Sequence, residues 1–359
     1  MPTIKDIAEA VGVSIGTVDR IIHKRGRFSE KTAEKVRQVM EELQYTPNIH
    51  ARGLKKTKSH SFAALIPHLT QDIGYWHLVA EGIQKAAAEL ESYGCRVSLF
   101  TFDRYSSESC CSVLQKALDS GIEGLLIAPV RPDAIKNFLK DLTIPYLFID
   151  SNIPELPGHL SYIGQDSFQS GILSGKLMSL LLGPAEGADA EVSVLLIDPP
   201  GSNPHLKKRM NGFRQYMLEN RKDILLIDMK EEEDDEGSFH RYLEEFFSSS
   251  DVLPRGVFVA NSSVYYVASY LEKKGETYCR IPLIGYDLIP GREEFIEKGI
   301  IDFILTQQPE DQGYKGVIQL YDSQVLQKDI QREVLTPLNI ITRENLHTFE
   351  HYAKKIKGV

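Results

Sequence analysis

The first side chains with an evident chemistry lie within the first 32 residues, and they suit contact with nucleic acid. Arg20 can donate two hydrogen bonds to the O6 and N7 atoms of guanine, and the side chain of Ile15 can contact the methyl group of thymine. Hydroxyl, imidazole and guanidinium groups around them can bind phosphate, an attraction that does not read sequence. The predicted DNA-contacting residues in this part are Thr3, Ser14, Ile15, Gly16, Thr17, Arg20, His23, Arg27, Ser29 and Thr32.

Elsewhere the chain lacks familiar motifs of catalytic and metal sites. Residues 171–177 (GILSGKL) are one residue too short between their glycines for a phosphate-binding loop. Leucine also follows the lysine where a magnesium-binding hydroxyl is required. No predicted strand is followed by GxGxxG, and HExxH is absent. The four cysteines show neither CxxC nor zinc-finger spacing: Cys95, Cys110, Cys111 and Cys279. We therefore expect no enzyme, no cofactor and no metal site.

Three helices are expected to position the DNA-contacting side chains. Apolar residues recur at helical spacing over residues 4–11, and Gly12 ends this first helix. Ser14 then caps a second helix and Ser29 caps a third, which Pro47 closes. Two helices joined by a glycine turn have the layout of a helix-turn-helix, in which the first turn of the second helix enters the major groove.

From Ser59 onward, short apolar runs alternate with amphipathic helical stretches. This alternation predicts an α/β fold with parallel sheets covered by helices on both faces. Nine strands are more than one sheet is expected to hold, so we predict two Rossmann-like lobes with a ligand-binding cleft between them. The strand candidates are residues 62–66, 96–102, 124–128, 146–149, 192–197, 224–229, 256–260, 282–285 and 303–306.

The formal net charge of −9 would be unusual for a nucleic-acid-binding protein, but it is unevenly distributed. Residues 1–60 contain 12 Lys and Arg against 7 Asp and Glu, which gives +5, and the remaining residues carry −14. A basic head on an acidic body suits a protein that contacts phosphate at one end only. No apolar run approaches the roughly 18 residues needed to span a membrane, and the start lacks a secretory signal. We expect a cytoplasmic protein.

The head resembles the lac repressor family (LacI/GalR) without a gap. The residues that carry the resemblance are Thr3-Ile4-Lys5-Asp6-Ile7-Ala8, Gly12-Val13-Ser14, Thr17-Val18, Arg20, Ser29, Lys31-Thr32, Val36, Leu43, Tyr45, Pro47-Asn48, Ala51 and Leu54. The family layout extends over the large domain. The resemblance implies a transcriptional regulator, expected to be a repressor, that binds operator DNA as a homodimer.

The resemblance also implies a hinge helix over residues 48–55 that folds on operator DNA. Leu54 stands where the family inserts a leucine into the minor groove, and Asn48 and Ala51 complete the predicted contacts. Eight residues are too few for a stable helix in water, so an order–disorder switch is physically reasonable. The alternative is a basic linker.

The predicted domains are a head at residues 1–47, a hinge at 48–58 and an effector-binding and dimerisation domain at 59–359. Within the last, the predicted N-lobe spans 59–162 and 309–336, and the predicted C-lobe spans 163–308 and 337–359.

The large domain resembles type I periplasmic sugar-binding proteins, which implies that ligand-binding groups lie just past the strand ends. Aromatic side chains can stack on the apolar face of a sugar ring, and Asp, Asn, Gln and Arg supply directional acceptors and donors for hydroxyls. The predicted effector-binding residues are Tyr75, Trp76, Asp150, Arg209, Asn261, Asp287 and Gln308.

The identity of the effector stays open at this point. Ser151 stands where some pentose-binding proteins carry arginine, and Lys207 and Lys208 leave a sugar phosphate possible beside a sugar or a polyol. We expect effector binding to change operator affinity by moving the two lobes. The alternative function is a sugar-binding receptor without DNA regulation.

Overall fold

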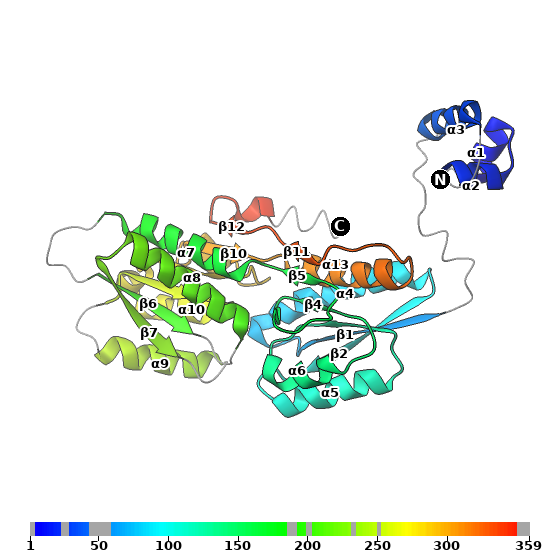
Figure 1. The fold of residues 1–359 in the computed structure, drawn as a ribbon. Helices are drawn as coiled ribbons and strands as arrows, with labels where there is room; N and C mark the ends of the chain where they lie inside the picture. Colours follow the sequence, from blue (N-terminus) through cyan, green and yellow to red (C-terminus); the bar gives the residue numbers. More distant parts are fainter. Residues whose placement is uncertain are drawn as a thin grey trace. The chain divides into compact units, whose positions relative to one another are not determined.

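A computed structural model describes residues 4–22, 29–42, 59–184, 192–198, 203–230, 235–249 and 253–349. The chain divides into two compact units, Met1–Lys58 and Ser59–Val359 (Figure 1). The predicted hinge at residues 48–58 lies outside the described residues. No helix in the described ranges is long and apolar enough to cross a membrane.

The first unit contains three helices, as predicted: α1 (Ile4–Val11), α2 (Ile15–Ile22) and α3 (Glu30–Glu42). Gly12 ends α1 with φ of 73°, a left-handed conformation that favours glycine, and its N–H bonds the carbonyl of Ala8 at 2.9 Å. The apolar side chains buried between the helices are Ile7, Ala8, Val18, Ile21, Ala33 and Val36. This small core holds α1 against α2 and α3.

The first lobe of the second unit is a parallel sheet of six strands in the order β11-β5-β4-β3-β1-β2. Helices α4 and α13 cover one face and α5 and α6 the other (Figure 1). The elements are β1 (His60–Pro67), η2 (Asp72–Gly74), α4 (Tyr75–Glu91), β2 (Cys95–Phe102), α5 (Ser107–Asp119), β3 (Gly124–Ile127), α6 (Pro132–Lys140), β4 (Tyr146–Ile149), β5 (Tyr162–Gly164), α13 (Pro309–Gln324) and β11 (Glu333–Leu335).

The second lobe repeats this plan, with the strand order β12-β10-β9-β8-β6-β7. Its strand pairs are parallel except β10 with β12. Its elements are α7 (Ser167–Leu182), β6 (Val192–Asp198), α8 (Pro204–Asn220), β7 (Ile224–Lys230), α9 (Glu236–Ser249), β8 (Gly256–Val259), α10 (Val264–Lys274), α11 (Glu276–Cys279), β9 (Leu283–Tyr286), α12 (Glu294–Glu297), β10 (Phe303–Thr306) and β12 (Asn339–Ile341).

The chain passes between the lobes three times. It leaves the first sheet after β5 to enter α7, returns from β10 to α13, and leaves again from β11 to β12. The first and third crossovers are tied together, because the N–H of Thr336 donates to the carbonyl of Gly164 at 2.7 Å.

All nine predicted strands are confirmed within a residue or two at their ends. The central strands are buried on both faces of the sheets, as expected for parallel strands beneath helices, whereas the edge strands β2 and β7 are only partly buried. The pattern did not predict β5, β11 and β12. Each has only three residues and lies at a crossover, where too little apolar periodicity exists to mark a strand.

Candidate functional site

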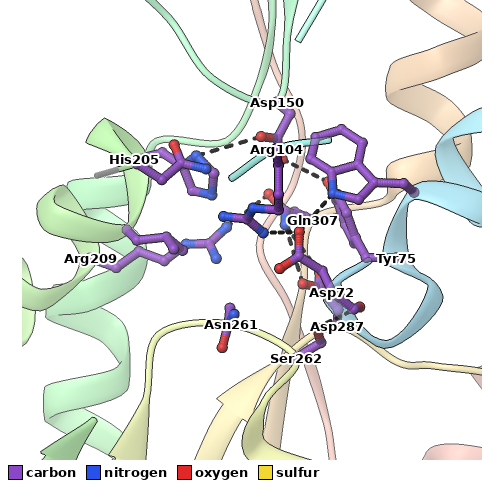
Figure 2. Close-up of a pocket in the computed structure, with 13 residues that line it drawn as sticks. Asp72, Tyr75, Arg104, Asp150, His205, Arg209, Asn261, Ser262, Asp287 and Gln307 are labelled. Atoms are coloured by element: carbon purple, nitrogen blue, oxygen red, sulfur yellow. Dashed lines mark hydrogen bonds and ion pairs between the residues drawn. The ribbon is translucent and has the colours of Figure 1, made fainter. Parts of the chain in front are cut away.

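A small cavity lies between the lobes at the carboxyl ends of both sheets, where parallel α/β proteins bind ligands (Figure 2). Its volume is only about 20 Å³, far below the roughly 300–1,000 Å³ of most small-molecule sites. A ligand therefore fits between the lobes only if they move apart. The lining residues are Asp72, Tyr75, Trp76, Arg104, Asp150, Asn203, His205, Leu206, Arg209, Asn261, Ser262, Asp287 and Gln307.

The guanidinium of Arg209 organises the second lobe's side of the cavity. Its Nη1 donates to the carbonyl of Ala260 at 2.8 Å, and its Nη2 donates to the Oε1 atoms of Gln165 at 3.1 Å and Gln307 at 2.8 Å. The guanidinium also lies 4.0 Å from the centre of the Tyr286 ring. Arg209 is only 1% exposed, so these contacts hold its charge in a single orientation.

Close helix packing positions Arg209 on α8. A Cβ atom added to Gly171 of α7 would lie 2.0 Å from the carbonyl oxygen of Arg209, and one added to Gly212 would lie 2.1 Å from that of Phe168. Only glycine allows this approach. The GILSGKL segment is thus part of the buried face of α7 and not a phosphate-binding loop, as the sequence analysis predicted.

The first lobe contributes a cluster centred on Asp72. This carboxylate forms an ion pair with Arg104 and accepts a hydrogen bond from Nε1 of Trp76 at 2.7 Å. Tyr75, the first residue of α4, donates from its hydroxyl to Oδ1 of Asp150 at 2.9 Å. Both aromatic rings are buried against the cavity, with their polar atoms engaged by carboxylates.

The backbone carries strain where it meets the cavity. Asp72, Asp150 and Asp287 have φ values of 51°, 65° and 66°, in the left-handed region that non-glycine residues rarely adopt. Strain of this kind clusters at ligand sites, where the surrounding structure fixes it. All three residues line the cavity, and their conformation turns each carboxylate at a strand or loop end toward it.

Side chains from the two lobes bond directly across the cavity. Ser262 donates from its hydroxyl to the carbonyl of Asp72 at 2.8 Å, and Ser151 donates to Oδ1 of Asn203 at 3.2 Å. Nδ1 of His205 lies 3.1 Å from Oγ of Ser151 and 3.5 Å from Oδ2 of Asp150. The lobes therefore meet through polar contacts that a ligand can replace or reinforce.

Burial dominates the protonation of the cavity's ionisable groups. It raises the pKa of Asp150 to about 6 and that of Asp287 to about 7, although the positive charge of Arg209 opposes both shifts. Burial, reinforced by Arg209, lowers the pKa of His205 well below its usual value. His205 is thus neutral at physiological pH, and the two carboxyl groups titrate close to that pH.

The Asp287→Asn variant is expected to change how stability depends on pH. Because the pKa of Asp287 is raised above the unfolded-state value of about 4, its contribution to the unfolding free energy is full below about pH 4 and is lost as the pH rises through about 7. The lowered pKa of His205 makes stability change with pH in the opposite direction. The contribution of Asp287 is therefore measured as the difference between the unsubstituted protein and the Asp287→Asn variant.

We expect the unfolding free energy of the unsubstituted protein, minus that of Asp287→Asn, to fall between about pH 4 and about pH 7. Urea unfolding followed by the fluorescence of Trp76, the only tryptophan, measures it. A difference that does not vary with pH would contradict the raised pKa.

The structure brings six of the seven predicted effector residues to this cavity: Tyr75, Trp76, Asp150, Arg209, Asn261 and Asp287. Gln308 is the exception and requires a correction, because Gln307 lines the cavity in its place. Gln308 has a left-handed backbone (φ 55°) and is the N-cap residue of α13.

The lining residues that the sequence analysis missed are Asp72, Arg104, Asn203, His205, Leu206, Ser262 and Gln307. Proximity to strand ends could have identified some of them, since Arg104 follows β2 by two residues and Gln307 directly follows β10. Asp72 had no such signal, because it begins the short 3-10 helix η2, five residues past the end of β1.

In the head, Ser14 and Ser29 precede α2 and α3 and cap them. Oγ of Ser14 accepts from the N–H of Thr17 at 3.2 Å, and Oγ of Ser29 accepts from the N–H of Thr32 at 3.2 Å. Gly16 is exposed in the first turn of α2. Ile15 and Arg20 lie on α2, but their side chains are not described; Thr3, His23, Arg27, Asn48, Ala51 and Leu54 lie outside the described residues.

Comparison with known protein families bears on both units. Residues 3–48 match the family described as "Bacterial regulatory proteins, lacI family", and residues 63–326 match the "Periplasmic binding protein domain". The second match covers most of the chain. The chain is a member of the lacI family with a periplasmic-binding-protein domain. The expected family and fold class are thereby confirmed.

Individual relatives agree with this assignment. The lacI-family chain is 31% identical to the HTH-type transcriptional regulator DegA of Bacillus subtilis over 222 residues, 60% of this chain and 61% of DegA. It is 31% identical to the ribose operon repressor of B. subtilis over 189 residues, 52% of this chain and 56% of the repressor. Both alignments thus span less than two thirds of the relative.

A crystal structure described as a LacI transcriptional regulator from Bacteroides fragilis has a TM-score of 0.70 and 28% identity. The match covers 81% of this chain and 99% of that one.

Proposed function

We propose that this lacI-family member is a cytoplasmic transcriptional repressor that binds operator DNA as a homodimer and changes its DNA affinity when a neutral polyhydroxy compound, a sugar or a polyol, binds between its lobes. The observation that carries the proposal is the pairing of a helix-turn-helix unit with a polar cavity between two lobes in one chain. The relative named as a ribose operon repressor supports a sugar as effector. We propose no catalytic role.

The charges of the cavity favour a neutral effector over a sugar phosphate. Three carboxyl groups, Asp72, Asp150 and Asp287, line it with two guanidinium groups, and His205 is neutral. A phosphate would lie close to these acids. Lys207 and Lys208, which left a phosphate possible from the sequence, are exposed, and neither lines this cavity.

Two unpartnered polar atoms favour hydroxyl groups on the effector. Oδ2 of Asp150 and Nε of Arg209 are buried and lack a hydrogen-bond partner among the described residues. A carboxylate oxygen accepts a hydrogen bond and a guanidinium nitrogen donates one. A hydroxyl group can donate to the first and accept from the second. Leaving such atoms unpaired costs about 1–3 kcal/mol each, so a ligand that pairs them gains affinity.

Arg209 also offers a route from effector to hinge. Gln165 and Gln307, which both accept hydrogen bonds from it, lie on the β5–α7 and β10–α13 crossovers. An effector that moves this guanidinium therefore acts on two of the three segments that join the lobes. We propose that this changes the angle between the lobes and, through residues 48–58, the affinity for DNA.

Removal of residues 1–58 from the chain is expected to abolish its specific binding to DNA. The test first selects the DNA fragments that the intact protein binds. It then measures how tightly the truncated protein and the Arg20→Ala/Leu54→Ala variant bind the same fragments. We expect a loss of at least about 100-fold, because base contacts and the minor-groove wedge are removed together.

A titration with sugars and polyols should then change the affinity of the intact chain for these fragments. Retention of DNA by the truncated protein would contradict the assignment of DNA binding to the head. If no sugar or polyol changes the affinity of the intact chain for DNA, the proposed regulatory coupling is contradicted. If the intact chain binds sugar but no DNA, the receptor alternative holds.

A further inference from the structure

A second cavity, which we call the crossover cavity, lies beside segments that join the lobes. Its volume is about 460 Å³, within the roughly 300–1,000 Å³ of most small-molecule sites. It is bounded by the loop after β4, the β5–α7 crossover, the start of α8 and strand β11. His205 is the one residue that lines both this cavity and the first. The crossover cavity therefore has its own set of binding groups.

Gln165 presents an unpartnered hydrogen-bond donor at the crossover cavity. The residue is only 2% exposed, and its Oε1 accepts the hydrogen bond from Arg209 at 3.1 Å. Because a guanidinium group only donates, the other amide atom of Gln165 is the NH₂ group. This Nε2 atom is buried and has no hydrogen-bond partner among the described residues. A carboxylate oxygen of a ligand would satisfy it.

The α8 side of the crossover cavity is electropositive. This helix has 17 residues and begins at Pro204, and the first N–H groups of a helix lack carbonyl partners within it. The side chain of Asn203, the N-cap residue, caps none of them. Lys208 adds a positive charge about one turn into α8, and it forms no ion pair within the described ranges. Together with Gln165, this side favours an anionic group.

The opposite side carries acceptors. Asp166 precedes α7 and Glu333 lies on β11, and both side chains are exposed at the cavity. Neither carboxylate has an ion-pair partner in the part of the chain that the structure describes. Oδ1 of Asn152, in the loop after β4, is buried and lacks a hydrogen-bond partner there as well. An ammonium group has three donors and a positive charge, so it complements these oxygens.

Apolar side chains lie beside the acceptors. Leu335 is two residues from Glu333 on β11, so both side chains project from the same face of the strand. Leu335 is 49% exposed, which is unusual for leucine, and Phe168 lines the same cavity. A ligand with an apolar group would remove part of this surface from water.

These features together match a zwitterion with an apolar side chain. A sugar could pair with the two buried amide atoms, but it would leave the opposite charges of Lys208 and Glu333 without partners. An inorganic anion would be repelled by Asp166 and Glu333. We propose that the crossover cavity binds a free α-amino acid, with its carboxylate toward the start of α8 and its ammonium toward β11. This site is separate from the proposed effector cavity and requires no saccharide.

Isothermal titration calorimetry of the full chain with free leucine, isoleucine, valine, methionine and phenylalanine tests this site. We expect at least one of them to bind with a dissociation constant below about 1 mM. The methyl ester of that amino acid lacks the carboxylate, and its N-acetyl derivative lacks the ammonium group. Each derivative should bind at least about tenfold more weakly, because each leaves the charges on one side of the cavity unpaired.

Charge-removing variants locate the bound amino acid. Lys208→Met and Glu333→Gln should each weaken its binding by at least about fivefold, because each removes one charge of the cavity. Lys207→Met and Glu155→Gln are the matched controls, since Lys207 and Glu155 are exposed and line neither cavity. Both controls should bind within about twofold of the unsubstituted protein. All four positions are exposed, and thermal unfolding checks that each variant is folded.

Three results would overturn the inference. The first is the absence of binding by all five amino acids, and the second is a methyl ester or N-acetyl derivative that binds as tightly as the parent amino acid. The third is an affinity that both Lys208→Met and Glu333→Gln leave unchanged, which would place the amino acid elsewhere. None of these results bears on the proposed function, because DNA binding and the effector are assigned to the head and the first cavity.

Discussion

The Arg209→Ala variant should lose effector binding by at least about 100-fold, the largest effect that the site predicts. The substitution removes the donor to three oxygens, on Ala260, Gln165 and Gln307, and each buried acceptor left unpaired costs about 1–3 kcal/mol. It also removes the positive charge that opposes the upward pKa shifts of Asp150 and Asp287. More of each carboxyl group is then protonated at neutral pH.

Calorimetry with the best-binding saccharide, together with the fluorescence of Trp76 in the cavity wall, measures this loss. Arg209→Lys should recover little, because an ammonium group cannot bond three oxygens in the planar geometry of the guanidinium. Arg214→Ala is the control on the same helix, since its partner Asp228 is exposed. Effector binding by Arg209→Ala within about threefold of the unsubstituted protein would show that the ligand lies elsewhere.

The Asp72→Asn variant should lower the unfolding free energy of the second unit by about 3–5 kcal/mol. Asp72 and Arg104 are each 5% exposed, so the substitution leaves a buried guanidinium without this carboxylate. Asparagine is chosen because it tolerates the left-handed backbone at this position, which isolates the loss of charge from backbone strain. Urea unfolding followed by Trp76 fluorescence provides the measurement.

A double variant distinguishes the buried charge from a general loss of packing. Asp72→Asn combined with Arg104→Met removes the guanidinium that has lost this carboxylate and should recover at least about half of the lost free energy. A double variant as unstable as the sum of the two single variants would contradict the ion pair as the cause. Because the carboxylate of Asp72 lies in the lining of the cavity, effector affinity should fall in the single variant as well.

The local pattern of the sequence determined the three helices of the head, the two-lobed α/β plan and the nine main strands. These features depend on apolar spacing and on caps such as Ser14 and Ser29, whose effects are local in the chain. Six of the thirteen cavity residues were predictable for a related reason. The carboxyl ends of parallel strands meet at one edge of a sheet, so Asn261 and Asp287, which follow the neighbouring strands β8 and β9, had to lie near one another.

Only the tertiary structure decided which partners those residues have and where the space between them lies. Asp72 reaches Arg104 and Ser262, and Arg209 reaches Gln307 98 positions away, because two sheets built from distant segments face each other. The three short crossover strands and the left-handed turn at Gln308 likewise follow from how the lobes are joined. Local periodicity carries no information about such contacts, since their free energy appears only when both lobes are folded and packed together.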